Sequence, residues 1–290
     1  MIVEKLAEED IPVQFLCKYF SVSTSRFYQW KRRKGGILFT RKSVICEAIR
    51  KQFANSKNTY GSPRIYEELK KQGIKVSKNT IAKYMQEMGL DARYKKRFKV
   101  MTTDSNHSGP FADRVVKFEE ENSLPEGPGE ILAGDITYLK TAVGFVYLAV
   151  VLDIFNREVV GWSMGNSLES KLVTDALSNA MHATNPDVQV IFHSDRGSQY
   201  ASTAYRKLLE NHDIVPSMSR KGNCYDNCYV ESWFGSLKKE WIYRKSYQNV
   251  EEIKQAVFEY IEIWYNKKRT HSALGYQSPQ EFRENYFAAQ

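Results

Sequence analysis

The chain has 290 residues, of which 42% are hydrophobic and 26% are charged, a composition that is ordinary for a folded globular protein. Its length suffices for two or three domains, each with its own core. No apolar run approaches the length of a membrane span, and the first residues lack the basic-then-apolar form of a signal peptide. These features exclude a membrane protein and a secreted protein, so we expect a cytoplasmic one.

The net charge of +8 is unevenly distributed along the chain. Residues 1–110 hold 23 Lys and Arg against 10 Asp and Glu, whereas residues 111–290 hold 19 against 24. This asymmetry favours an N-terminal third that binds a polyanion and a remainder whose carboxylates can hold metal. A solvated helical surface without a partner is the alternative interpretation of the same charges.

The four cysteines form no zinc motif. Cys224 and Cys228 are close in sequence, but neither Cys17 nor Cys46 supplies a second pair at zinc-site spacing. Cysteines are normally reduced in the cytoplasm. We therefore expect no structural zinc site.

The first part of the chain predicts a helix-turn-helix unit. Residues 2–9 and 11–20 have helical patterns, and Ser23 suits the N-cap of a following helix with Phe27 and Trp30 on its inner face. Basic residues occupy the outer face of that helix. A short helix, a turn and a capped basic helix are typical of DNA-binding helix-turn-helix units.

A second unit of the same kind is predicted over residues 60–90, after a helix at 41–54. Ser62 suits the N-cap of its first helix, Gly73 suits the stop, and Ser77 suits the N-cap of its second helix. For either unit, a helical hairpin that docks on the core or on a partner is the alternative to DNA binding.

Basic residues in and after the second unit are candidate DNA contacts. The segment at 93–99 interleaves five basic residues with two aromatics, which suits an arm tracking a nucleic-acid backbone, although a solvated linker is equally open. The candidates from these segments are Arg64, Lys78, Lys83, Lys95, Lys96 and Arg97.

The remainder predicts a mixed sheet flanked by helices. Residues 102–110 read as loop and 113–121 as a short helix, and a Pro- and Gly-rich run then indicates a domain boundary. Strands are expected at 131–140, 144–152, 158–164, 188–192 and 214–217, with helices at 169–182 and 203–212. Three hairpin-linked strands followed by alternating helices and strands imply an α/β fold with a mixed sheet.

Three carboxylates in this region are candidate metal ligands and catalytic residues. Asp135 lies in the first strand, Asp195 ends a buried strand, and Glu231 lies near the start of an amphipathic helix, with 35 residues between Asp195 and Glu231. Lys238 follows two helical turns after Glu231 and points roughly the same way. Convergent carboxylates need a neutralising cation, and hard oxygen ligands favour Mg²⁺ or Mn²⁺.

The motifs GDITY, HSDRGSQY and NCYDNCYVESWFGSLKKE resemble those of DDE transposases with a retroviral-integrase catalytic core. They are most similar to the OrfB subunit of bacterial insertion sequences of the IS-three group. That group has Asp, Asp, 35 residues and Glu, with a basic residue seven positions later, as here. The resemblance implies an RNase H-like fold and two Mg²⁺ ions held by Asp135, Asp195 and Glu231. It also favours Lys238 as a DNA contact.

The implied function is metal-dependent DNA strand cleavage and strand transfer at insertion-sequence ends. The implied partners are double-stranded DNA at the terminal inverted repeats and at the target, further copies of the chain on DNA, and an OrfA protein or fused OrfA segment. We expect a bacterial cytoplasmic protein that joins the nucleoid when bound to DNA. A catalytically silent DNA-binding regulator is the main alternative. An RNase H-type nuclease is disfavoured by the two helix-turn-helix units.

The expected organisation has five segments. They are an N-terminal helix-turn-helix-like region at 1–57, a second helix-turn-helix domain at 58–100, a linker at 101–130, the catalytic core at 131–245, and a C-terminal helix and tail at 246–290. A helix is predicted over residues 251–268. His271 follows it and is interpreted as structural or DNA-contacting. Asp153 is interpreted as a turn residue and Asp226 as a helix cap.

Overall fold

The computed structural model describes residues 6, 11–35, 41–92, 111–118, 120, 124–181, 189–220 and 227–290. The chain divides into two compact units, Met1–Asp91 and Ala92–Gln290, which are described separately. Of the sequence predictions, the helix at 2–9 (except residue 6), the loop at 102–110 and the basic run at 93–99, with Lys95, Lys96 and Arg97, lie outside the described residues, as do Cys224 and Asp226. Within the described ranges, no helix is both long and apolar enough to cross a bilayer.

The first unit begins with the predicted pair of short helices, α2 (Val13–Tyr19) and α3 (Thr24–Gly35). Phe27 is buried against Leu16 and Cys17, and Trp30 packs on the edge of this cluster. The Ser23 hydroxyl lies 3.5 Å from the Arg26 N–H, at the start of α3. The inner face therefore holds the residues that the helical spacing predicted.

Three further helices of this unit, α4 (Arg41–Asn55), α5 (Ser62–Lys71) and α6 (Lys78–Glu87), bury hydrophobic side chains in a small core. Ser77 caps α6 as expected, because its hydroxyl accepts the Thr80 N–H at 3.1 Å. Gly61, and not Ser62, occupies the N-cap of α5, since Ser62 is already helical. Gly73 has φ +75° just after α5, a conformation that favours glycine.

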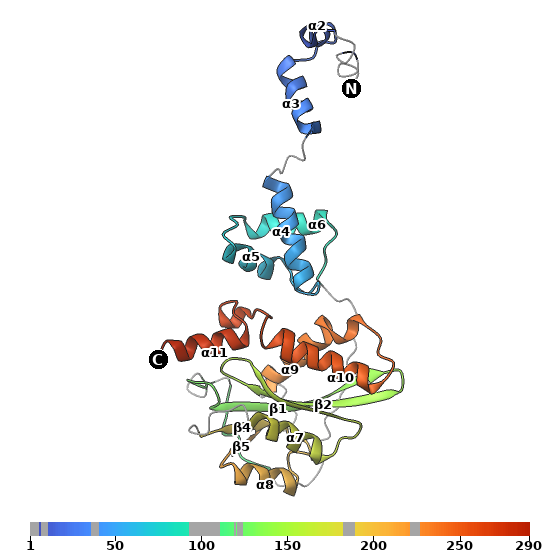
Figure 1. Ribbon diagram of the computed structural model, residues 1–290. Helices are drawn as coiled ribbons and strands as arrows, with labels where there is room; N and C mark the ends of the chain where they lie inside the picture. The colour runs from blue at the N-terminus through green and yellow to red at the C-terminus, as the bar shows by residue number, and fades with distance from the viewer. Residues whose placement is uncertain are drawn as a thin grey trace. The chain divides into compact units, whose positions relative to one another are not determined.

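The second unit contains a five-stranded sheet with the order β3-β2-β1-β4-β5 (Figure 1). The strands are β1 (Ile131–Thr141), β2 (Gly144–Asp153), β3 (Val159–Gly165), β4 (Ile191–Ser194) and β5 (Val215–Met218). The first three pair antiparallel, whereas β4 pairs parallel with both β1 and β5. This is the mixed sheet predicted from the strand pattern.

Helices cover both faces of the sheet. On one face, α7 (Ser170–Met181) and α8 (Thr203–Asn211) pack over a core that includes Leu132, Val151 and Phe192. On the other face lie α9 (Cys228–Glu240) and α10 (Val250–Phe258) (Figure 1). Gly161 on β3 permits close packing of α7, because a Cβ there would overlap the Ala176 carbonyl oxygen.

The helix predicted at 113–121 is wrong for its described residues. Residues 111–117 have no helical structure. The N–H groups of Val115 and Val116 donate to the Ser217 hydroxyl at 3.1 and 3.0 Å, and the Asp113 carbonyl accepts the Met218 N–H at 3.3 Å. Hydrogen bonds to β5 thus replace those that a helix would make with itself.

The predicted helix at 251–268 is α10 followed by a π-helix, η4 (Glu259–Tyr265). The remaining elements are the 3₁₀-helices η3 (Ile242–Arg244) and η5 (Ser272–Leu274) and the final helix α11 (Pro279–Ala288). Trp233 of α9 meets Tyr260 and Tyr265 of η4 edge to face, at centroid distances of 6.0 and 5.7 Å. This aromatic cluster fixes α9 relative to the C-terminal segment.

His271 makes structural contacts, one of its two expected roles. Its Nε2 lies 2.7 Å from Arg269 Nη1, its ring meets that of Tyr265 edge to face, and its backbone bridges to Gln277. A DNA contact by His271 remains a prediction.

Candidate active site

Asp135 and Asp195 each follow directly after the last residue pair of two neighbouring parallel strands. The β1–β4 ladder ends with Gly134 opposite Ser194, so Asp135 is the next residue of β1 and Asp195 is the first residue after β4. Neighbouring strands lie about 4.8 Å apart. The register therefore brings together two carboxylates that are 60 residues apart in sequence.

Backbone N–H groups orient both carboxylates. Asp135 Oδ1 accepts the N–H of Ile136 at 2.7 Å, and Asp195 Oδ1 accepts that of Gly197 at 2.9 Å. His193 anchors the end of β4, because its two ring nitrogens lie 2.9 and 3.1 Å from the hydroxyls of Ser217 and Ser219.

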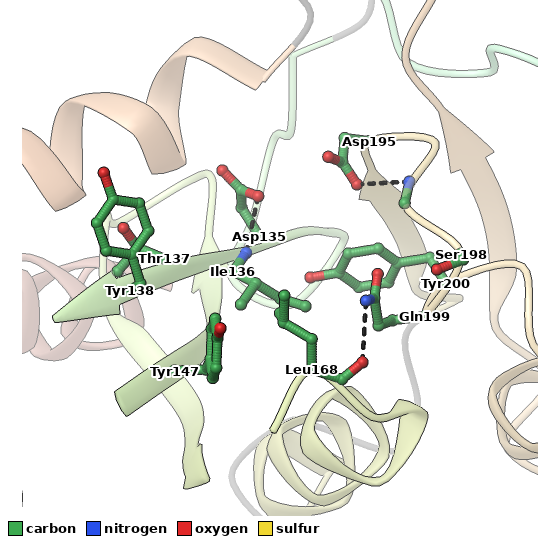
Figure 2. A pocket seen from close by; sticks show the side chains of 11 residues that line it. Asp135, Ile136, Thr137, Tyr138, Tyr147, Leu168, Asp195, Ser198, Gln199 and Tyr200 are labelled. Carbon is green, nitrogen blue, oxygen red and sulfur yellow. Dashed lines mark hydrogen bonds between the residues drawn. The ribbon is translucent and has the colours of Figure 1, made fainter. Parts of the chain in front are cut away.

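One pocket contains both aspartates (Figure 2). Its other walls come from β1, from Tyr147 of β2, from Leu168 before α7, and from the loop after β4. The Gln199 amide donates to the Leu168 carbonyl at 3.0 Å, which ties the loop after β4 to the segment before α7. The pocket lies at the C-terminal end of β4, an arrangement common for binding sites in α/β folds.

The electrostatics of the pocket disfavour two negative carboxylates. Burial raises the pKa of Asp135 well above its usual value, and the charges of Asp195 and Glu231 raise it further, while Lys238 opposes the shift. Burial likewise raises the pKa of Tyr200, with contributions from Asp135 and Asp195. A cation in the pocket would relieve this repulsion.

Glu231 is close enough to affect Asp135, but it lines a different hollow on the surface of α9, with Cys228 and Ser232. In the part of the chain that the structure describes, no group of three or more His, Cys, Asp and Glu side chains is arranged to hold a metal. The structure therefore brings Asp135 and Asp195 together and leaves Glu231 outside their pocket.

Lys238 contacts β1 directly. Its ammonium donates to the Thr137 hydroxyl at 2.6 Å and lies 5.0 Å from the centre of the Tyr138 ring. Burial lowers the pKa of Lys238, and the negative charge of Asp135 partly counters that shift. The contact of Lys238 with DNA that the sequence predicts would be additional to its contact with β1.

Several residues of the pocket were not candidates from sequence. Tyr200 stands in the quoted motif HSDRGSQY, so its place after Asp195 was a usable signal. Tyr147 and Leu168 carried no such signal, because only the strand register and the packing of α7 bring them to the pocket.

Two models of the integrase core domain match this chain, at residues 125–224 and 231–287, and an HTH-like domain model matches residues 41–98. The transposase InsF for insertion sequence IS3A of Escherichia coli K12 is 37% identical over 287 residues, covering 97% of both chains. The chain belongs to the IS3 family of transposases. An uncharacterized 31 kDa protein of insertion element IS600 from Shigella sonnei is 36% identical over 271 residues, covering 93% of this chain and 98% of that protein.

Solved structures similar to this IS3-family transposase include integrases. The HTLV-2 integrase catalytic core domain in complex with magnesium is 17% identical, with a TM-score of 0.42 over 55% of this chain and 98% of that one. The Mos1 mariner transposase catalytic domain is 14% identical, with a TM-score of 0.40 over 55% and 76%. The matching family models and the sheet order confirm the expected RNase H-like integrase fold and the HTH-like domain before it.

The HTH-like domain of this IS3-family transposase carries the described DNA-contact candidates. Lys78 and Lys83 are exposed on α6, and Arg64 on α5 lies 5.3 Å from the centre of the Tyr60 ring. The matched range begins at the first residue of α4, so that helix belongs to the domain. The contacts of individual residues with DNA remain predictions.

Proposed function

We propose that Asp135, Asp195 and Glu231 are the catalytic carboxylates with which this transposase cuts DNA at the ends of its insertion sequence and joins the cut strand to target DNA. The observation that carries the proposal is the register of β1 and β4, which supports a paired role for the two aspartates. A single pocket open to solvent holds both, as a site for a phosphodiester requires.

Magnesium fits the donor chemistry of this pocket. Two carboxylates share one cavity, and their repulsion and burial disfavour the doubly charged pair without a cation. We assign Asp135, Asp195 and Glu231 as the residues that would hold two Mg²⁺ ions, for which Mn²⁺ can substitute. Bound there, the ions would stabilise negative charge on the attacking and leaving oxygens of the phosphodiester.

The protein's own contribution is positioning. The N–H groups of Ile136 and Gly197 fix one oxygen of each aspartate before DNA binds, which reduces the reorganisation needed for the reaction. Water first cleaves a phosphodiester at the element end and leaves a 3′-hydroxyl. That hydroxyl then attacks a phosphodiester of the target DNA, so that a new phosphorus–oxygen bond forms while the target strand's own 3′-oxygen leaves as a hydroxyl. No residue of the protein becomes covalently attached to DNA.

Glu231 joins the pair in the assembled complex. It lies in the first turn of α9, and its charge already raises the pKa of Asp135. A small shift of this turn toward β1, favoured by bound cations, would complete the set of three carboxylates. Lys238 on the same helix would contact DNA beside them.

The assembly proposed for the reaction contains more than one copy of the chain on double-stranded DNA. The terminal inverted repeats and the target are its DNA partners, and an OrfA protein or fused OrfA segment assists end recognition. We place the protein in the bacterial cytoplasm, on the nucleoid when it is bound to DNA.

The test uses labelled duplex DNA with the element's terminal repeat, incubated with the purified chain and Mg²⁺, with a parallel reaction in Ca²⁺. We expect Mg²⁺-dependent nicking or joining that is lost in Asp195→Asn and in Glu231→Gln, with DNA binding retained. Glu210→Gln on α8, an exposed carboxylate outside the pocket, is the matched control.

Substantial cleavage by either variant would refute the assignment. Binding without cleavage by the unmodified chain would indicate either a silent regulator or an incomplete enzyme. The same assay with an OrfA-fused chain distinguishes these, because only an incomplete enzyme gains cleavage.

A further inference from the structure

The β1–β2 hairpin carries an aromatic row, Tyr138, Phe145 and Tyr147. The strand register places Tyr138 opposite Tyr147, and Lys140 opposite Phe145. Alternate residues of a strand share a face, so all four side chains lie on the same face of the hairpin. The rings of Tyr138 and Phe145 meet edge to face, with centroids 5.3 Å apart.

The inner end of the aromatic row belongs to the pocket of the two aspartates. Tyr138 and Tyr147 line that pocket together with Asp135 and Asp195 (Figure 2). The cavity has a volume of about 100 Å³ and is open to solvent. A group bound against Tyr147 is therefore next to the carboxylates.

The outer end of the row is open to solvent. Further along β2, Ala149 lies on the same face and is buried in the core that α7 covers. Toward the turn, Phe145 is 52% exposed and Lys140 is exposed. The described elements thus leave the outer half of this face uncovered.

Positive charge accompanies the aromatic row. Lys140 stands opposite Phe145 on the face of the row itself, and Lys238, which reaches β1 from α9 on the other face, lies 5.0 Å from the centre of the Tyr138 ring. None of the paired positions on this face from Ile136 to the turn carries an acidic side chain. Aromatic rings beside cations are the chemistry that binds single-stranded nucleic acid, because bases stack on the rings and phosphates contact the cations.

We propose that the aromatic row binds unpaired bases of the DNA strand next to the phosphate that is cut. This inference rests on the proposed function, which places that phosphate at Asp135 and Asp195. The row starts in the same pocket, so the nucleotide that adjoins the phosphate is the one within reach of Tyr147. A base can stack on these rings only when its base pair is open, and stacking has little sequence preference. The aromatic row should therefore bind a melted element end more tightly than an intact duplex.

The test measures stacking directly and needs no cleavage. Element-end DNA carrying 2-aminopurine at the nucleotide beside the cut is mixed with the full chain in Ca²⁺, once as a duplex and once with its last nucleotides unpaired. We expect the chain to quench the fluorescence and to bind the unpaired form more tightly. Phe145→Leu and Tyr147→Leu keep an apolar side chain but remove the ring, so each should weaken binding of the unpaired form by about tenfold.

Phe287→Leu is the matched control, because Phe287 on α11 is also 52% exposed. Unchanged quenching and affinity in both hairpin variants would overturn the proposal, as would an equal loss in Phe287→Leu. If Phe145→Leu dissociates an oligomer and leaves the quenching unchanged, this face binds a second copy of the chain. That result would also overturn the proposal. Loss of cleavage in Asp195→Asn is a separate readout, so a failure here is distinguishable from a failure of the proposed function.

Discussion

The side chain of Asn266 forms two hydrogen bonds with the backbone of Val159. Its Oδ1 accepts the Val159 N–H at 3.0 Å, and its Nδ2 donates to the Val159 carbonyl at 2.9 Å. Val159 begins β3, the edge strand of the sheet, so the amide occupies the place of a neighbouring strand. The C-terminal segment is thereby fastened to the sheet.

Asn266→Ala should lower the free energy of unfolding by about 3 kcal/mol, because it leaves a buried N–H and a buried carbonyl without partners. Urea denaturation of the full chain measures the change. Asn179→Ala is the matched control, since Asn179 is exposed and also donates to a β3 carbonyl, that of Trp162. Its effect should stay within about 0.5 kcal/mol, and equal effects of the two substitutions would contradict the interpretation.

The ion pair of Arg269 with Glu240 should be important for stability. Two bonds join them, at 2.6 and 2.7 Å, and the Arg269 side chain is only 3% exposed. Arg269→Met should destabilise the fold by about 3–5 kcal/mol, because it leaves the Glu240 charge without its cation. Lys171→Met breaks the exposed pair with Asp175 and should cost less than about 1 kcal/mol. Similar melting temperatures for the two variants would refute this prediction.

Gly134→Ala should disturb the pocket. A Cβ at this position would overlap the Phe192 ring and lie 3.4 Å from the Tyr200 hydroxyl, one residue before Asp135. We expect a loss of stability of about 1–3 kcal/mol from overpacking, together with reduced cleavage. Gly235→Ala has open space around it in α9 and should stabilise the chain by about 0.5–1 kcal/mol. Unchanged stability and cleavage in Gly134→Ala would show that the strand can shift freely.

Asp153 should make stability dependent on pH. Burial raises its pKa from 3.8 to about 6, even though it accepts the N–H groups of Gly129 and Phe155. At pH values between 3.8 and about 6, Asp153 is protonated in the folded state and ionised in the unfolded state. The contribution of this proton to the free energy of unfolding is therefore present at low pH and is lost as the pH rises through 6. The loss amounts to about 3 kcal/mol.

Asp153→Asn removes that titration. The destabilisation that it causes should therefore be largest near pH 4 and smaller at pH 7, as measured by urea denaturation at both values. Glu210→Gln, at an exposed position on α8, should show no such trend. A difference between Asp153→Asn and the unmodified chain that does not change with pH would contradict the raised pKa.

Lys78→Ala and Lys83→Ala should each weaken DNA binding without changing sequence preference. Both ammonium groups are exposed on α6, and removing a cation that binds one phosphate should reduce the slope of log K against log salt by about one. Binding at several salt concentrations measures the slope. Lys71→Ala, at the last residue of α5, is the control, and a common slope for all three variants would remove both residues from the DNA interface.

The sequence allowed most of the fold to be predicted, because periodicity reports which residues face a core. The expected strand at 131–140 is β1 within one residue, and the helix at 203–212 is α8 within one residue. The helix expected at 113–121 was wrong because Ser217, about a hundred positions away, supplies the hydrogen-bond partner. Periodicity carries no information about such distant partners.

The site was predictable only in part, for the same reason. Motifs indicated Asp135 and Asp195, but only the parallel pairing of β1 with β4 makes them neighbours. Tyr147 reaches the pocket through the antiparallel register with β1. The π-helix η4 and the bonds of Asn266 to Val159 also depend on tertiary packing and had no local signal.

The pairing of β1 with β4 has a consequence for synthesis of the chain. One neighbour of β1 in the sheet is β2, which follows it directly in the sequence. The other neighbour is β4, whose residues lie 60 positions after their partners in β1. A nascent chain can form the hairpin early, whereas the two aspartates meet only after α7 and β4 have emerged from the ribosome. Prematurely terminated chains that end before β4 therefore lack Asp195, and with it the carboxylate pair that we propose for cleavage.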